Sequence, residues 1–133
     1  MPSSASPASD RARLFTYGTL MRGYGLHAVL ARGATFLAEG SVPGHLLDLG
    51  RYPGLVPGRG RVRGELYRVE DPALLPVLDR AEGVQFVRGR TTVTFARGRR
   101  ARAWVYRYRG PRDRAVRIPD GDYRSHSGRL RWR

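Results

Sequence analysis

The chain has 133 residues, which fits one domain, and its 41% hydrophobic and 27% charged residues indicate a globular protein with a packed core. It contains no cysteine, which excludes disulfides, thiolate metal sites and a cysteine nucleophile. The formal net charge is +14, and all 25 basic residues are arginines. Because nucleic-acid-binding proteins usually combine arginine with lysine, we interpret this excess as a bias of composition.

The chain ends and the charge distribution define its organisation. No apolar run approaches the ~20 residues of a membrane-spanning helix, and residues 1–10 lack the apolar core of a signal peptide. We therefore expect a soluble cytoplasmic protein with no membrane contact. The sequence predicts a disordered tail over 1–12, one domain over 13–124 and a basic tail over 125–133. Residues 59–133 carry a net charge of +12, from 20 arginines and 8 acidic residues.

The first predicted element is a strand, Leu14–Tyr17, which leads into a glycine-rich loop. One or two helical turns follow over His27–Arg32, ended by a glycine. The pattern from Thr35 to Leu49 predicts two short strands that are broken around Pro43 and Gly44. The next stretch, residues 50–60, is rich in turn residues and is long enough to be a functional loop.

The second half of the chain begins with a predicted strand over Arg61–Val69, because its residue pattern alternates between two faces with a period of two. A helix is predicted over Pro72–Ala81, with Asp71 as its N-cap. The segments Phe86–Phe95 and Ala101–Arg109 form a predicted hairpin that turns near a glycine.

Residues 112–133 contain no clear periodicity, and we interpret them as irregular and basic. One helix and about six strands in mixed order predict an α+β fold. Its simplest form is a small mixed, mainly antiparallel β-barrel with short helices packed on its ends.

The tetrapeptide Tyr17-Gly18-Thr19-Leu20 stands where the first strand ends. Successive backbone N–H groups in such a loop can point into a common hollow and bind an anion such as a carboxylate. The simpler alternative is that Gly18 only allows a turn.

Glu82 follows the predicted helix directly and precedes Gly83. The negative end of the helix dipole and burial would both raise its pKa, and screening weakens the opposing effect of exposed arginines. A carboxyl with this property can take and return a proton near neutral pH. The alternative is a solvated surface group. Asp79 is expected to pair with Arg80 or Arg88.

Other site patterns are absent. Residues 58–64 miss the dinucleotide-binding spacing and precede a strand, and the absence of lysine excludes a Walker motif. His27, His45 and His126 lack the spacing of metal ligands, so no metal site is predicted.

Trp104, Tyr106 and Tyr108 alternate along a predicted strand, among arginines. Aromatic side chains among arginines are typical of surfaces that bind single-stranded nucleic acid. The same spacing is also produced by a strand that packs one face inward, which we favour.

Taken together, these segments resemble the γ-glutamylcyclotransferase-like family, in the branch with the γ-glutamylamine cyclotransferases and the plant avirulence-induced proteins. The resemblance spans Leu14 to Asp122. It rests on these motifs, in order: Tyr17-Gly18-Thr19-Leu20, Gly50-Arg51-Tyr52-Pro53-Gly54-Leu55, Val62 with Gly64-Glu65-Leu66-Tyr67, Leu78-Asp79, Glu82-Gly83, Arg88, Ala103 with Tyr106, and Gly121-Asp122. Two positions depart from the family pattern: Phe86 replaces a tyrosine, and Tyr123 replaces a tryptophan.

The resemblance implies the family's small mixed barrel and a γ-glutamyl substrate that is cyclised to 5-oxoproline with release of an amine. It implies that the N–H groups of Gly18, Thr19 and Leu20 bind the substrate carboxylate, that Tyr17 shapes the pocket and that Glu82 transfers protons. It implies no metal and no cofactor.

Two alternatives stay open: a member of this fold that binds a small acidic metabolite without turnover, and a basic barrel that binds nucleic acid through residues 97–109. The sequence determines neither which amine leaves nor whether two chains form a homodimer.

Overall fold

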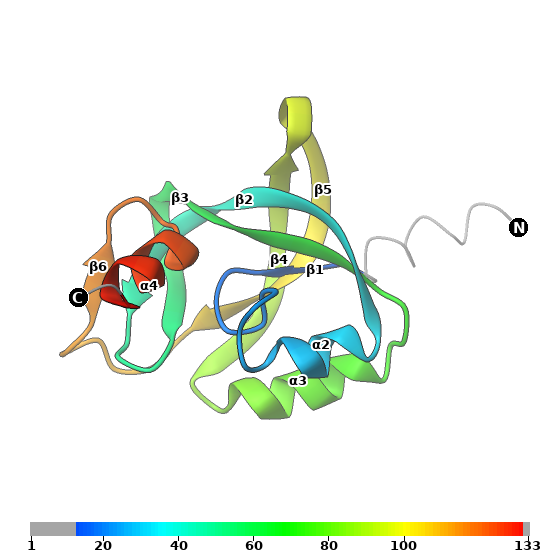
Figure 1. The fold of residues 1–133 in the computed structure, drawn as a ribbon, viewed down its shortest axis with the longest axis horizontal. Coiled ribbons are helices and arrows are strands. Elements are labelled where there is room, and N and C mark those ends of the chain that lie inside the picture. Colours follow the sequence, from blue (N-terminus) through cyan, green and yellow to red (C-terminus); the bar gives the residue numbers. More distant parts are fainter. Residues whose placement is uncertain (1–12, 132–133) are drawn as a thin grey trace, which may run out of the picture.

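The computed structural model describes residues 13–131, with side chains as far as Ser127. Strands are the main regular elements, and short helices lie between them (Figure 1). The predicted tail over 1–12 lies outside the described residues. In chain order the elements are β1 (Arg13–Thr16), α2 (His27–Ala31), β2 (Ala34–Asp48), β3 (Pro53–Val69), α3 (Leu74–Glu82), β4 (Phe86–Phe95), the 3₁₀ turn η2 (Ala96–Gly98), β5 (Arg99–Tyr108), β6 (Val116–Ile118) and α4 (Tyr123–Arg131).

The strands pair with one another in a ring. β1 pairs antiparallel with β3, β3 with β2, β2 with β4, and β4 with β5. A parallel contact between β5 and β1 then leads back to the first strand, and β6 pairs antiparallel with β2 (Figure 1). These pairings confirm the predicted α+β class and the mainly antiparallel sheet.

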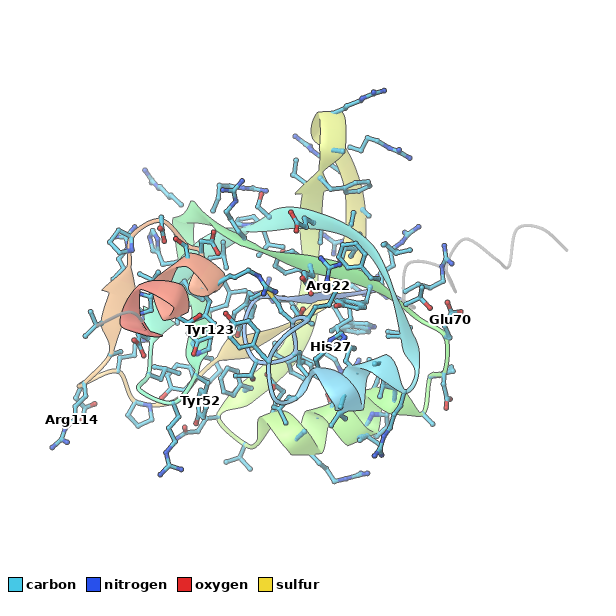
Figure 2. The ribbon with its side chains drawn as sticks, viewed as in Figure 1. Arg22, His27, Tyr52, Glu70, Arg114 and Tyr123 are labelled. Atoms are coloured by element: carbon cyan, nitrogen blue, oxygen red, sulfur yellow. The ribbon has the colours of Figure 1, made fainter. Side chains whose placement is uncertain are left out.

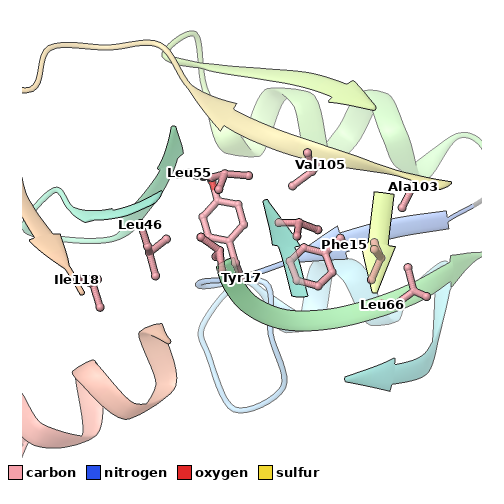
Figure 3. Packing of buried hydrophobic residues seen from close by; sticks show 11 residues of the cluster. Phe15, Tyr17, Leu46, Leu55, Leu66, Ala103, Val105 and Ile118 are labelled. Atoms are coloured by element: carbon pink, nitrogen blue, oxygen red, sulfur yellow. Dashed lines mark hydrogen bonds between the residues drawn. The ribbon is translucent and has the colours of Figure 1, made fainter. Parts of the chain in front are cut away.

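Two hydrophobic clusters form on opposite faces of the strands. Leu14 and Phe15 are neighbours in β1 but belong to different clusters, because successive side chains of a strand point to opposite faces. The first cluster, with Phe15, lies between the strands of the ring (Figure 3). The second, with Leu14, joins the sheet to α2 and α3 through Leu30, Leu74 and Leu78.

The aromatic side chains of β5 are part of this packing. Tyr106 is 2% exposed and Tyr108 is 5% exposed, and Trp104 packs against the second cluster. This confirms the packing interpretation for the two tyrosines, because buried rings are not available to stack on bases.

The stretch predicted as a long loop over residues 50–60 is mostly strand, so that prediction was wrong, as was the break in the strand before it. β2 is one strand, and its pairing with β3 shifts register between Pro43 and His45. Residues 57–60 have no partner in this register, so the proline and glycine signals mark a bulge rather than a loop. The turn itself is short, and the N–H of Leu49 donates to the carbonyl of Tyr52 at 3.0 Å.

The C-terminal region also differs from its prediction as irregular chain, because it contains β6 and α4. Asp122 caps α4 through a hydrogen bond from the N–H of Ser125 to its carboxylate at 3.3 Å. His126 reaches Asp48 of β2 at 2.8 Å, and Ser127 contacts the hydroxyl of Tyr24 at 2.6 Å. Contacts with distant residues therefore hold a helix that has little hydrophobic pattern of its own.

Candidate active site

Three backbone donors in the loop after β1 have no acceptor within the described part of the protein. The N–H of Met21 donates to the carbonyl of Gly18 at 2.9 Å, and the carbonyls of Thr19 and Leu20 accept from the N–H of Leu26 and from Nδ1 of His27. Within residues 13–131, the N–H groups of Gly18, Thr19 and Leu20 donate to no protein acceptor. Unpaired N–H groups in succession form a concave site that suits an anion.

Glycine is required in this loop because β3 approaches it closely. A Cβ built on Gly18 would lie 2.6 Å from Cγ of Pro53. Tyr17 fixes the start of the loop, since its hydroxyl donates to the carbonyl of Tyr106 at 2.6 Å and accepts from the N–H of Leu55 at 3.1 Å. Burial raises the pKa of Tyr17, so this hydroxyl stays neutral and structural.

Glu82 is the last residue of α3, and the helix stops there because Gly83 adopts a φ of 88°. The side chain is half-buried, and within the described chain its carboxyl has no hydrogen-bond or ion-pair partner. Burial raises the pKa of Glu82 to about 7. The predicted direction is therefore confirmed, with burial as its cause.

The structure brings Glu82 and the loop together. Both line one cavity of about 70 Å³ that opens to solvent. The predicted site residues Tyr17, Gly18, Thr19, Leu20 and Glu82 all belong to its wall. The wall also contains Phe15, Thr16, Leu26, Tyr52, Pro53, Ala81, Phe86 and Tyr106.

Two of these further residues of the cavity wall pack against each other. Tyr52 and Phe86 meet edge to face, with ring centroids 5.7 Å apart (Figure 2 labels Tyr52). The motif around Tyr52 was part of the resemblance, but it carried no assigned site role. Asp79 lies outside this cavity and pairs with Arg88 at 2.9 Å, as expected.

A buried carboxylate that does not line this cavity holds the loop after β1 through Arg22. Glu65 of β3 is 3% exposed and accepts from the N–H of Arg22 at 3.0 Å, from Nε of Arg22 at 3.1 Å and from the hydroxyl of Tyr67 at 2.8 Å. Arg124 of α4 adds a contact at 3.3 Å. Burial raises the pKa of Glu65, but these hydrogen bonds outweigh it, so the pKa lies below its usual value. Arg22, His27 and Tyr123 lie around the loop (Figure 2).

Replacing Glu65 by glutamine is expected to lower the free energy of unfolding at pH 7 by about 1.5–3 kcal/mol, since hydrogen bonds to a charged acceptor are lost. The pKa of Glu65 is lower in the folded state than in the unfolded state. The loss should therefore be full above pH 4.5 and shrink as the pH falls through the folded pKa. Urea unfolding at several pH values measures it.

The matched control is Glu39→Gln. The Glu39 side chain is 78% exposed and contacts the same Arg22 at 3.7 Å, so its replacement should change stability by less than about 0.5 kcal/mol. Equal losses for the two variants would contradict the assigned role of Glu65.

Among the described residues, no group of three or more histidine or acidic side chains is placed to hold a metal ion. Within the same part of the chain, no helix is long and apolar enough to span a bilayer. The expected absence of a cofactor stays a prediction.

The chain is similar to several known proteins in sequence and in fold. The chain is 36% identical over 114 residues to the γ-glutamylcyclotransferase family protein YtfP of Escherichia coli K12, covering 84% of this chain and 95% of that protein. The fold matches the crystal structure of an uncharacterized protein from Pyrococcus horikoshii with a TM-score of 0.75 and 26% identity, over 90% of this chain and 96% of that one.

A mouse AIG2-like protein is also similar, with a TM-score of 0.64 and 32% identity over 72% of this chain and 76% of that chain. The model of the γ-glutamyl cyclotransferase, AIG2-like family matches residues 14–125. The match includes the loop after β1 and Glu82. The chain therefore belongs to the γ-glutamyl cyclotransferase, AIG2-like family.

Proposed function

We propose that this protein is a γ-glutamylcyclotransferase that converts the γ-glutamyl group of a γ-glutamyl amine or γ-glutamyl amino acid into 5-oxoproline and releases the amine. The observation that supports this most directly is the shared cavity. Its wall contains the loop with three unpaired N–H groups. It also contains Glu82, whose carboxyl has a pKa of about 7.

In the proposed reaction, the N–H groups of Gly18, Thr19 and Leu20 bind the substrate α-carboxylate. Glu82 accepts a proton from the α-amino group, whose nitrogen attacks the γ-carbonyl carbon. A new C–N bond closes the five-membered lactam, and the C–N bond to the leaving amine breaks. Glu82 then returns the proton to the leaving nitrogen, and a loop N–H is our choice of donor to the developing oxyanion.

The chemistry asks little more of the protein. The nucleophile and the carbonyl belong to one molecule, so holding the carboxylate and folding the substrate chain supplies much of the rate enhancement. A single group that exchanges a proton near neutral pH is sufficient for both proton transfers. This agrees with a site whose wall contains one carboxyl and no cationic side chain among the residues described.

Incubation with a panel of γ-glutamyl amines and γ-glutamyl amino acids is expected to release 5-oxoproline and the free amine in equal amounts, measured by mass spectrometry. Calorimetry with the same compounds separates the alternatives. Binding without product would support a non-catalytic metabolite-binding protein. Neither binding nor product with any compound would overturn the proposal.

A further inference from the structure

Tyr106 of β5 contacts both parts of the candidate active site. Its backbone carbonyl accepts a hydrogen bond from the hydroxyl of Tyr17 at 2.6 Å, at the start of the loop that lines the cavity. Its own hydroxyl donates to Oδ1 of Asp79 at 2.6 Å, and Asp79 lies in α3 three residues before Glu82. Tyr106 also lines the cavity and is 2% exposed. One residue therefore connects the loop to the helix that carries Glu82.

Asp79 is fixed to two strands of the sheet. Besides the bond from Tyr106, it accepts from Arg88 of β4, with Nε to Oδ1 at 2.9 Å and a terminal nitrogen to Oδ2 at 3.1 Å. Arg88 and Tyr106 are direct partners in the pairing of β4 with β5, so their side chains share one face of the sheet. The bond from Arg88 lowers the pKa of Asp79 and burial raises the pKa of Tyr106, so at neutral pH the acceptor stays charged and the donor keeps its proton. These charge-assisted contacts hold the end of α3 against the sheet.

The position of Glu82 depends on this end of α3. Residues three apart in a helix are neighbours on its surface, so Asp79 and Glu82 lie on adjacent parts of one face. The backbone carbonyl of Asp79 accepts the N–H of Gly83 at 3.3 Å, which closes the turn that presents Glu82. Within the described residues the carboxyl of Glu82 has no hydrogen-bond or ion-pair partner of its own. Its place in the cavity is therefore set by the backbone turn that Asp79 fixes.

We infer that the hydrogen bond from Tyr106 to Asp79 holds Glu82 in place for proton transfer, which makes Tyr106 a positioning residue. This inference rests on the proposed function. A general acid–base group must lie within hydrogen-bond reach of the proton that it moves, and a displacement of ~1 Å can cost about 100-fold in rate. The loop N–H groups that bind the substrate carboxylate do not depend on this bond. Its loss should therefore slow the chemical step more than it weakens substrate binding.

The variant Tyr106→Phe removes the hydroxyl and keeps the ring. We expect kcat to fall at least ~10-fold while KM stays within ~3-fold, because the bond acts on the chemical step. The matched control is Tyr108→Phe, on the same strand. Tyr108 is 5% exposed, its hydroxyl donates to the carbonyl of Pro111 at 2.6 Å, and it does not line the cavity. The control loses a buried bond of equal length and should keep kcat within ~2-fold. Equal losses of kcat in the two folded variants, or a change in KM alone, would overturn the inference.

A double-variant cycle tests whether Tyr106 acts through Asp79. Asp79→Ala removes the acceptor and should lower kcat at least as much as Tyr106→Phe does. Combining the two changes should cost less than ~2-fold beyond Asp79→Ala alone, because the bond between the two residues is already lost. Independent, multiplying losses would contradict a positioning role through Asp79.

Titration of the Glu82 carboxyl gives a readout that needs no turnover. NMR of protein with ¹³C-labelled glutamate follows this carboxyl, and the signal is assigned by its absence in Glu82→Gln. In the unmodified protein the midpoint should lie at about 7, because burial raises the pKa of Glu82. Tyr106→Phe should lower the midpoint by at least ~0.5 pH unit, since a displaced turn brings the carboxyl closer to water. Tyr108→Phe should leave it unchanged.

Neighbouring charges do not account for the expected shift. The other titratable or charged side chains of the cavity wall and of the contacts around Asp79 are those of Tyr17, Tyr52, Asp79, Arg80, Arg88 and Tyr106. Tyr106→Phe removes none of their charges, because burial keeps the Tyr106 hydroxyl neutral. If the unmodified protein releases no 5-oxoproline, the proposed reaction is wrong, and the titration then tests the positioning of Glu82 alone. Equal midpoints in the unmodified protein and both tyrosine variants would overturn the inference.

Discussion

Replacing Glu82 by glutamine is expected to lower kcat at least ~100-fold, the range that general acid–base catalysis contributes. Glutamine has nearly the same shape and fits the same position at the end of α3, but it cannot accept and return a proton. The measurement is the steady-state rate of 5-oxoproline release, with circular dichroism to establish that the variant is folded.

Glu70→Gln is the control for this experiment, because the Glu70 side chain is 51% exposed and, among the described residues, its ion pair is a long contact to Arg68 at 3.9 Å. Its activity should equal that of the unmodified protein. If Glu82→Gln retains full activity while Glu70→Gln behaves as expected, another group transfers the protons and the proposed mechanism is wrong.

The pH profile gives a second readout of the same residue. The proposed reaction needs Glu82 in its charged form, so kcat/KM of the unmodified protein should rise with pH and level off above a midpoint of about 7. The residual activity of Glu82→Gln should lack this rise. A midpoint near 4.5 would mean that the carboxyl titrates as an exposed group, contrary to its burial.

The local elements of the fold could be predicted where the sequence signal is local. The strand before the glycine-rich loop, the helix ending at Glu82 and the hairpin of β4 and β5 all follow from apolar periodicity and turn residues. The predicted N-cap at Asp71 was wrong, because α3 begins at Leu74 after Ala73, and the Asp71 carboxylate accepts from the N–H of Ala73 at 3.0 Å instead. The long β2–β3 pair could not be predicted in this way. Its prolines and glycines suggest turns, but in the structure they lie within the paired strands, where the register shifts at a bulge.

The helix α4 could not be predicted from its local sequence either. Its sequence is rich in arginine and serine, and the contacts that hold it come from Tyr24, Asp48 and Glu65, all more than 50 residues away. No pattern within the helix encodes those partners.

The candidate site was predictable to the extent that its residues stand at element ends. Gly18 follows a strand and Glu82 ends a helix, and both positions are visible in the sequence. Their meeting in one cavity depends on how β1 and α3 pack on the sheet, which local patterns do not contain. Tyr52 and Phe86 entered the site by that packing alone.

The burial that adapts Glu82 for proton transfer should also make the folded protein less stable at alkaline pH. The pKa of Glu82 rises from 4.5 in the unfolded chain to about 7 in the folded protein, so the folded state disfavours the charged carboxylate. The contribution of the neutral carboxyl to stability is full below pH 4.5 and is lost as the pH rises through 7. A shift of this size corresponds to about 3 kcal/mol.

Glu82→Gln should therefore be more stable than the unmodified protein at pH 8, by up to about 3 kcal/mol, and about equally stable at pH 4. Urea unfolding at the two pH values measures this, again with Glu70→Gln as the control that should show no gain. The direction is opposite to that of Glu65→Gln, which loses stability at neutral pH, so unfolding at several pH values distinguishes the two carboxyls. If Glu82→Gln gains nothing at pH 8, the charged carboxylate is well solvated in the folded protein. The cavity would then lack the group that the proposed reaction requires, because an ordinary carboxyl returns a proton poorly at neutral pH.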